Sequence, residues 1–139
     1  MTASLEFEVA NKLSALFPAM EELSRWLEEQ QAAPAGAYLA TLALEELVTN
    51  SVKYGYDDQA EHVIRVRVEL TPAGMTMVVE DDGNPFNPLE QVEPDTNLPI
   101  EDRPLGGLGL HLLRKLSDRM EYAWKNDRNR VTLHKASGV

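Results

Sequence analysis

The amino-acid sequence predicts an α+β fold: a two-layer sandwich in which a mixed, mainly antiparallel sheet carries about three helices on one face. Two observations lead to this prediction. Segments with the two-residue period of strands follow one another in pairs joined by short turns, which favours hairpins over parallel strands. Segments with helical spacing separate these strands, and no internal repeat or linker interrupts the 139 residues. We therefore expect a single domain over residues 1–139.

The first half of the chain predicts one strand and two helices. Residues 4–9 alternate apolar and polar side chains, as a half-buried strand does. Apolar residues at helical spacing then predict a helix over about residues 13–27, with Pro18 in its first turn or bending it. A second helix is expected over residues 37–54, after an Ala-Pro-Ala-Gly segment that breaks the pattern.

The second half predicts two hairpins separated by a loop and a helix. The expected strand pairs are 63–70 with 75–79 and 120–125 with 130–135. The turns between them are 71–74 and 126–129. Residues 84–105 contain five of the eight prolines and many acidic side chains, so they predict a long loop that is either a functional lid or disordered. A third helix follows this loop.

Composition limits the kinds of partner. The chain has no cysteine, which excludes disulfides and thiolate metal sites. Its formal net charge of -10 argues against a nucleic-acid surface, because phosphate backbones are held by clustered Lys and Arg. A nucleotide remains open, since Mg²⁺ and backbone N–H groups can hold its phosphates. We find neither a membrane-length apolar run nor a signal peptide, so we expect a cytoplasmic protein without membrane contact.

The second predicted helix carries two polar residues on its apolar face. Glu46 and Asn50 fall within the apolar arc of a helical wheel, whereas Glu45 falls on its flank. A buried carboxylate and a buried amide need polar partners, so the pair is either a satisfied contact at the edge of the core or part of a site. In a site, the amide oxygen suits Mg²⁺ and the carboxylate can accept a proton from an attacking hydroxyl.

Two further motifs are weak when taken alone. Asp81-Asp82-Gly83 at a strand end is either an ordinary acidic turn or a carboxylate that accepts a hydrogen bond from an exocyclic amino group, with a glycine close to a flat ring. Gly106-Gly107-Leu108-Gly109 at a helix start can present backbone N–H groups to phosphate. It matches neither the dinucleotide-binding pattern nor the Walker pattern.

Together, in this order and with a long loop between the second and third, the motifs resemble the GHKL (Bergerat-fold) ATPases. Residues 46–55 resemble the N box, Asp81-Asp82-Gly83 the G1 box and Gly107-Leu108-Gly109 the G2 box. The chain is most similar to the anti-sigma-factor serine/threonine kinases, above all over residues 106–122.

The resemblance implies roles for single residues. Glu46 would be the catalytic base, Asn50 would bind Mg²⁺, and Asp81 would accept a hydrogen bond from the adenine amino group. The other implied nucleotide contacts are Gly83 beside the ring, Gly107, Leu108 and Gly109 at the phosphates, and Thr132 near the adenine. Residues 84–105 would be the ATP lid.

Two positions depart from the family pattern. Tyr54 stands where many family members have a histidine, and two residues separate Arg103 from the glycines. Arg103 either reaches the phosphates or forms an ion pair within the lid. The three histidines, at positions 62, 111 and 134, lack the spacing of metal ligands, so we expect no metal site from them.

The function implied by the resemblance is an ATP- and Mg²⁺-dependent serine/threonine protein kinase that acts as an anti-sigma regulatory factor. Its partners would be a STAS-domain antagonist, which it phosphorylates, and a sigma factor, and it would form a homodimer. The alternative is a nucleotide-gated binding module with little or no transfer activity, which sequesters a regulatory protein. The base Glu46 favours the kinase, because a pure binder does not need it.

Overall fold

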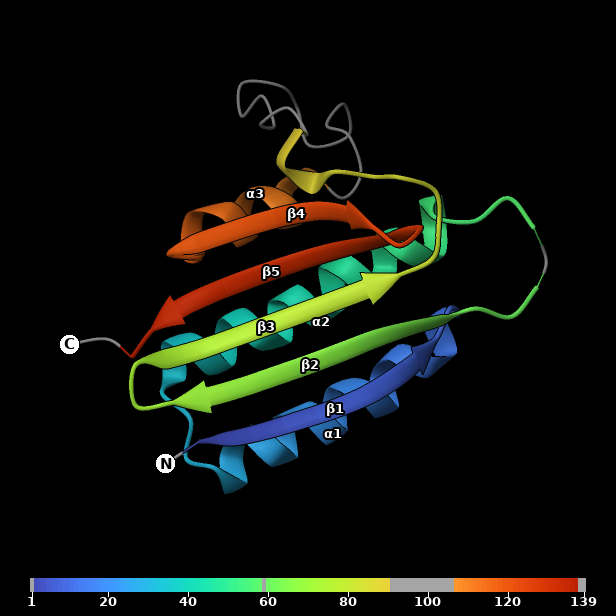
Figure 1. Cartoon of the computed structure of the whole chain (residues 1–139). Helices are drawn as coiled ribbons and strands as arrows, with labels where there is room; N and C mark the ends of the chain where they lie inside the picture. The colour runs from blue at the N-terminus through green and yellow to red at the C-terminus, as the bar shows by residue number, and fades with distance from the viewer. Residues whose placement is uncertain (1, 59, 91–106, 138–139) are drawn as a thin grey trace.

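The computed structural model describes residues 2–58, 60–90 and 107–137. These residues form a five-stranded sheet with three helices on one face (Figure 1). The strand order is β1-β2-β3-β5-β4. All four strand pairings are antiparallel. The predicted α+β sandwich is thus confirmed, and among the described strands the sheet is wholly antiparallel rather than mixed.

The N-terminal strand and helix form one edge of the sandwich. Strand β1 (Ala3–Ala10) is followed by a 3₁₀ turn, η1 (Leu13–Ala15), and by helix α1 (Leu16–Glu29). Pro18 lies in the first turn of α1, where its missing N–H breaks no helical hydrogen bond. The buried residues of α1 recur every four positions, so one face of the helix packs on the sheet: Ala19, Leu23 and Leu27.

Helix α2 (Pro34–Tyr54) is the long central helix and carries the predicted N box. It begins three residues before the predicted start, because Pro34 occupies the first turn, where its fixed φ suits a helix. The side chains of Leu39, Leu44 and Val48 are fully buried. Each such burial contributes roughly 1.5–3 kcal/mol, so packing against the sheet holds this helix in place.

The two hairpins make up the rest of the sheet. Strand β2 (Val63–Thr71) pairs with β3 (Gly74–Asp81), and β4 (Arg119–Lys125) pairs with β5 (Arg128–Ala136). The second hairpin turns on only two residues, Asn126 and Asp127, with φ of 55° and 60°. Such a turn continues the right-handed twist of its strands. Strand β5 therefore starts two residues earlier than predicted, and Asn129 belongs to the strand rather than to the turn.

The last helix and the start of the predicted lid lie at the same end of the molecule (Figure 1). Helix α3 (Gly107–Leu116) begins in the glycine-rich motif and buries Leu110 and Leu113. Of the segment predicted as a lid, the structure describes residues 84–90, which include a 3₁₀ turn, η2 (Pro88–Glu90). Residues 91–106, including Arg103, lie outside the described residues. Among the helices that are described, none has the length and apolarity to span a membrane.

Candidate functional site

The C-terminal half of α2 presents the first predicted pair. Glu45 is exposed, Glu46 is partly buried, and Asn50 is 8% exposed. The predicted inward direction of Glu46 and Asn50 is therefore confirmed. The Nδ2 atom of Asn50 is buried without a hydrogen-bond partner among the described residues. A buried amide without a partner is costly, so this atom marks a position where a polar ligand would lower the free energy.

The start of α3 lies directly against Glu46. A Cβ atom added to Gly109 would overlap the Glu46 carboxylate. Any side chain at this position would force the Glu46 carboxylate to turn away from α3, so glycine allows the two groups to lie in contact. The third motif thus meets the first, and the helix N-terminus that could bind phosphate lies beside the carboxylate that could accept a proton.

The surroundings of Glu46 change its acidity. Burial raises the pKa of the Glu46 carboxyl above its ordinary value, and the negative charge of Glu45 raises this pKa further. The positive charge of Lys53 opposes both effects but does not outweigh them. A carboxylate whose pKa lies closer to neutral is a better general base, because it binds the abstracted proton more strongly.

The end of β3 meets the end of α2. The Gly83 amide donates a hydrogen bond to Oδ1 of Asp81 over 2.9 Å, which closes a tight turn. The Asn84 amide donates to the Gly55 carbonyl over 2.6 Å. A Cβ atom added to Gly83 would lie 2.6 Å from that carbonyl oxygen. Gly83 therefore allows the second motif to pack backbone against backbone on the last residue of the first motif.

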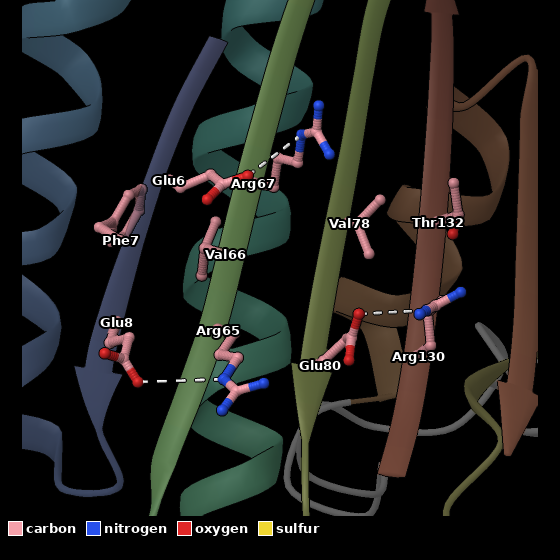
Figure 2. Close-up of a pocket in the computed structure, with 10 residues that line it drawn as sticks. All are labelled: Glu6, Phe7, Glu8, Arg65, Val66, Arg67, Val78, Glu80, Arg130 and Thr132. Carbon is pink, nitrogen blue, oxygen red and sulfur yellow. Dashed lines mark hydrogen bonds and ion pairs between the residues drawn. The ribbon is translucent and has the colours of Figure 1, made fainter. Parts of the chain in front are cut away.

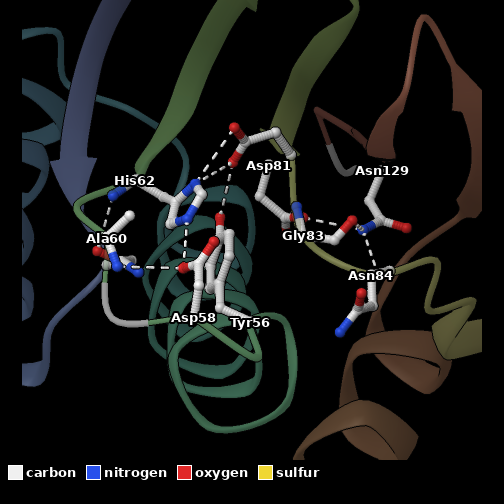
Figure 3. Close-up of polar contacts among 10 residues, drawn as sticks. Tyr56, Asp58, Ala60, His62, Asp81, Gly83, Asn84 and Asn129 are labelled. Carbon is white, nitrogen blue, oxygen red and sulfur yellow. Dashed lines mark hydrogen bonds and ion pairs between the residues drawn. The ribbon is translucent and has the colours of Figure 1, made fainter.

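Asn129 is the site residue that sequence reasoning missed (Figure 3). It is 5% exposed, and its Nδ2 donates to Asp81 Oδ1 and to the Asn84 carbonyl, both over 2.9 Å. The sequence pattern assigns Asn129 to the turn over residues 126–129 and not to the strand. Extending the alternation of Val131 and Leu133 back by one step would have placed Asn129 on the buried face.

The structure does not bring Thr132 to the Asp81 side chain. Thr132 pairs with Val78, and its neighbour Val131 pairs with Val79. Successive side chains of a strand point to opposite faces, so Val131 and Val79 face the helices and Thr132 faces the open side of the sheet. Figure 2 shows Thr132 there among residues of the open face. The prediction that Thr132 lies near the adenine is wrong on this geometry.

Two hollows lie on opposite faces of the sheet. The larger, about 750 Å³, lies on the open face and is crossed by ion pairs such as the exposed Glu8–Arg65 and the partly buried Glu80–Arg130 (Figure 2). It contains neither Glu46 nor Asp81 among its lining residues. Exposed ion pairs contribute little to stability. Because the larger hollow includes neither Glu46 nor Asp81, we place the candidate site on the helix side of the sheet.

The cavity on the helix side is small. It is lined by residues of α2, of β3 and the segment after it, and of β5, including Asn50, Asp81 and Asn129, and measures about 30 Å³. That is roughly the volume of one water molecule in the liquid. Phe86 and Pro88 line the same cavity, so an adenine ring can enter only if this segment moves outward. Tyr54, which replaces the family histidine, also lines the cavity and is 51% exposed.

His62 lies beside the site, in contact with Tyr56, Asp58 and Asp82 (Figure 3). The rings of Tyr56 and His62 stack with centroids 4.2 Å apart. The His62 ring contacts Asp58 Oδ1 at 2.8 Å and Asp82 Oδ1 at 3.2 Å. The hydrogen bond to Asp58 is the main reason that the pKa of His62 is raised. Burial raises the pKa of Tyr56 to about 12, so its hydroxyl remains a donor to Asp82.

Comparison with known proteins adds a family and relatives. A family model described as a histidine kinase-like ATPase domain matches residues 9–135. The anti-sigma F factor of Clostridium novyi is 28% identical over 120 residues, which cover 85% of this chain and 74% of the relative. A serine/threonine-protein kinase, BtrW, of Bordetella bronchiseptica is 23% identical over 96 residues, which cover 69% and 68%.

A third relative and a solved structure agree with these matches. The serine-protein kinase RsbW of Staphylococcus aureus is 31% identical over 105 residues, which cover 72% of this chain and 59% of the relative. A crystal structure of the RsbU and RsbW domains of a Mycobacterium tuberculosis protein has a TM-score of 0.62 at 18% identity. That match covers 95% of this chain and 32% of the solved one, and it supports the fold.

The family match spans all three motifs and every helix and strand of the structure except the first six residues of β1 and the last of β5. It agrees with the contacts that bring Glu46, Gly109 and Asp81 around one end of α2. The chain belongs to the family of histidine kinase-like ATPase domains.

Proposed function

We propose that this protein is an ATP-dependent serine/threonine protein kinase that acts as an anti-sigma regulatory factor. The relatives named as anti-sigma factors and serine kinases support this proposal. The observation that carries it is the contact between the Glu46 carboxylate and Gly109 at the start of α3. A proton acceptor beside a phosphate-binding helix N-terminus is the arrangement that phosphoryl transfer to a hydroxyl needs.

Asp81 is the proposed residue for recognition of the base. Its Oδ1 already accepts hydrogen bonds from Gly83 and Asn129, which leaves Oδ2 to accept one from the exocyclic amino group of adenine. Asp81 lines the cavity on the helix side. Gly83 has no side chain, so a flat ring can lie close to the backbone at this point.

The donor groups of the site suit Mg²⁺-ATP. The buried Nδ2 atom of Asn50 has no hydrogen-bond partner within residues 2–58, 60–90 and 107–137, and rotation of this amide would present its oxygen, a ligand that Mg²⁺ accepts. The first backbone N–H groups of α3, at Gly107, Leu108 and Gly109, lack partners within the helix and can meet phosphate oxygens. The nucleotide would supply the γ-phosphoryl group. Its entry requires Phe86 and Pro88 to leave the cavity.

Glu46 acts as the general base in this proposal. It accepts the proton of a serine or threonine hydroxyl on the partner while the hydroxyl oxygen forms a bond to the γ-phosphorus and the bond to ADP breaks. Burial holds the pKa of Glu46 above its ordinary value, which strengthens it as a base. The exposed Glu45 has no such position and accepts no proton in this step, and it acts only through the charge that raises the pKa of Glu46.

The proposed setting follows from the resemblance. The phosphorylated partner is a STAS-domain antagonist, the sequestered partner is a sigma factor, and the protein works as a homodimer in the cytoplasm. The net charge of -10 fits protein partners better than nucleic acid. Large exposed apolar side chains, such as Phe17 and Leu13 one turn apart, offer surface for protein contacts.

The kinase proposal is tested with purified protein, a candidate STAS partner and labelled ATP. We expect phosphate transfer to a serine or threonine of the partner, and a rate in Glu46→Gln that is lower by about 10²–10⁴-fold. Glu45→Gln is the matched control, because it changes the neighbouring exposed carboxylate, and it should retain transfer near neutral pH. Partner binding without transfer, equal in the protein and in Glu46→Gln, would favour the binding module instead.

A further inference from the structure

The amide of Asn129 uses all of its hydrogen-bonding capacity. Its Nδ2 donates to Asp81 Oδ1 and to the Asn84 carbonyl, both over 2.9 Å. Its Oδ1 accepts from the Phe86 amide over 3.0 Å and from the Tyr122 hydroxyl over 2.6 Å. Two donors and two acceptors are all that a carboxamide offers. The side chain is therefore held from four directions at a buried position.

The partners also fix which way the amide points. Nδ2 faces a carboxylate and a carbonyl, which only accept, while Oδ1 faces a backbone N–H, which only donates. Burial raises the pKa of Tyr122, so its hydroxyl keeps the proton that it donates to Oδ1. Turning the amide over would place like groups against each other at the Asp81, Asn84 and Phe86 contacts, and only the Tyr122 hydroxyl, which can also accept, would tolerate the change.

This amide determines how the Asp81 carboxylate is presented. Asp81 Oδ1 is held from one side by Asn129 and from the other by the Gly83 amide (Figure 3). With both bonds on one oxygen, the carboxylate cannot rotate without losing them. Oδ2 is then the oxygen left for a ligand in the cavity that both side chains line.

We propose that Asn129 is a positioning residue that sets the base preference of the nucleotide site. It does so by holding Asp81 Oδ1, so that Oδ2 accepts a hydrogen bond from the 6-amino group of adenine. A 6-oxopurine presents an acceptor at that position and would meet the carboxylate with no proton between them. This inference rests on the proposed nucleotide site. It adds a β5 residue to the recognition of the base.

The size of the effect follows from the chemistry of the pairing. A site built to accept a substrate N–H rejects an analogue without it, because the polar group of the site is left unpaired. A hydrogen bond to a charged group is strong enough that its loss changes affinity by about ten-fold or more. ATP and inosine triphosphate make the same phosphate contacts, which cancel in the ratio of their affinities. This ratio therefore reports on how the Asp81 carboxylate is oriented toward the base.

The test compares two variants at Asn129 by competition with a fluorescent ATP analogue. Asn129→Leu removes the amide at similar volume. Asn129→Asp keeps the acceptors for Phe86 and Tyr122 but loses both donors and sets a second carboxylate beside Asp81. We expect the protein to prefer ATP over inosine triphosphate by about ten-fold or more, and both variants to lose most of this preference at about pH 7.5.

A pH readout separates positioning from a structural role. Two adjacent carboxylates share one proton, so at about pH 5.5 the carboxyl introduced by Asn129→Asp is protonated and can again donate to Asp81. Asn129→Asp should then regain preference for ATP, whereas Asn129→Leu should not. Thr132→Val is the matched control, because it alters the same strand on the opposite face, and it should keep the preference at both pH values.

The outcomes are distinguishable. If folded Asn129→Leu or Asn129→Asp keeps the full preference for ATP, or if Asn129→Asp shows no recovery at low pH, the positioning role is overturned while the nucleotide site stands. If the unaltered protein binds neither nucleotide, the proposed function is wrong and this inference falls with it. Circular dichroism establishes which variants are folded, and either one alone is enough for the comparison near neutral pH.

Discussion

At the scale of single residues, Glu45 and Glu46 are neighbours in the chain but lie in different surroundings. Glu45 is exposed, whereas Glu46 is partly buried against Gly109. This difference follows from the helical period alone, which is why the sequence was sufficient to choose between them. The pKa of Glu46 depends on burial by other elements, so it could not be read from the sequence.

The raised pKa of Glu46 predicts the pH dependence of phosphate transfer. A base acts only when it is deprotonated, so transfer should fall on the acid side at a higher pH than the ordinary glutamate pKa of about 4.3 would give. A pH–rate profile at saturating ATP measures this limb. Glu45→Gln removes a negative charge that raises the pKa of Glu46, so it should move the limb to lower pH. An unmoved limb in Glu45→Gln would contradict this explanation.

His62 predicts a pH dependence of stability rather than of activity. Its pKa is raised in the folded protein, mainly by the hydrogen bond to Asp58. The folded state therefore binds the proton more tightly than the unfolded state does, and the stabilisation is fully present below the unfolded pKa of about 6.5. It is lost as the pH rises through the folded value.

The measurement for His62 is the thermal midpoint of the protein and of His62→Gln across the same pH range. The midpoint difference should be largest at roughly pH 5 to 6 and should shrink at alkaline pH. Asp58→Asn should reduce the difference, because Asp58 is the main partner of the ring. A difference that does not vary with pH would contradict the proposed charge on His62.

At the scale of elements, strand and helix positions were predictable from periodicity, but the predicted start of β5 was two residues too late. Val131 and Leu133 alternate with Arg130 and Thr132, so the sequence already placed Thr132 on the face opposite the core. The role near the adenine came from the family resemblance, which conflicts with this alternation. The role of Asn129 depends on a two-residue turn and on contacts with β3, and neither is visible in the local pattern.

The contact between α2 and α3 predicts the effect of a single methyl group. Gly109→Ala would place a Cβ against the Glu46 carboxylate, so this flexible side chain must turn away from α3. The proposed base is then displaced, while the packing of the two helices changes little. We expect a large loss of phosphate transfer with only a small change in the thermal midpoint.

The matched control for Gly109 is Gly36→Ala in α2. A Cβ there would lie 3.4 Å from Met75 Cβ, at the edge of ordinary van der Waals contact. Alanine also favours the folded helix, by roughly 0.4–1 kcal/mol at a compatible site. Gly36→Ala should therefore be tolerated in both stability and transfer. Phosphate transfer by Gly109→Ala equal to that of Gly36→Ala would contradict a role for the close approach of Glu46 to α3.

At the scale of the whole molecule, the fold class followed from the order of strands and helices, and the site follows from how they pack. Three motifs that are far apart in the sequence meet because α3 packs against α2 and the end of β3 packs against Gly55. The sequence predicted the members of this group by resemblance. The sequence could not predict the small size of the cavity on the helix side, because that size depends on where Phe86 and Pro88 lie.

The most direct measurement of the central claim is the thermal midpoint with and without Mg²⁺-ATP. Binding to the native state stabilises it by about 2.7 kcal/mol at a ligand concentration of about 100 times Kd. We expect millimolar Mg²⁺-ATP to raise the midpoint, and we expect Asn50→Ala or removal of Mg²⁺ by a chelator to abolish most of the rise. A midpoint that does not change at millimolar Mg²⁺-ATP would contradict a nucleotide site between α2, β3 and α3.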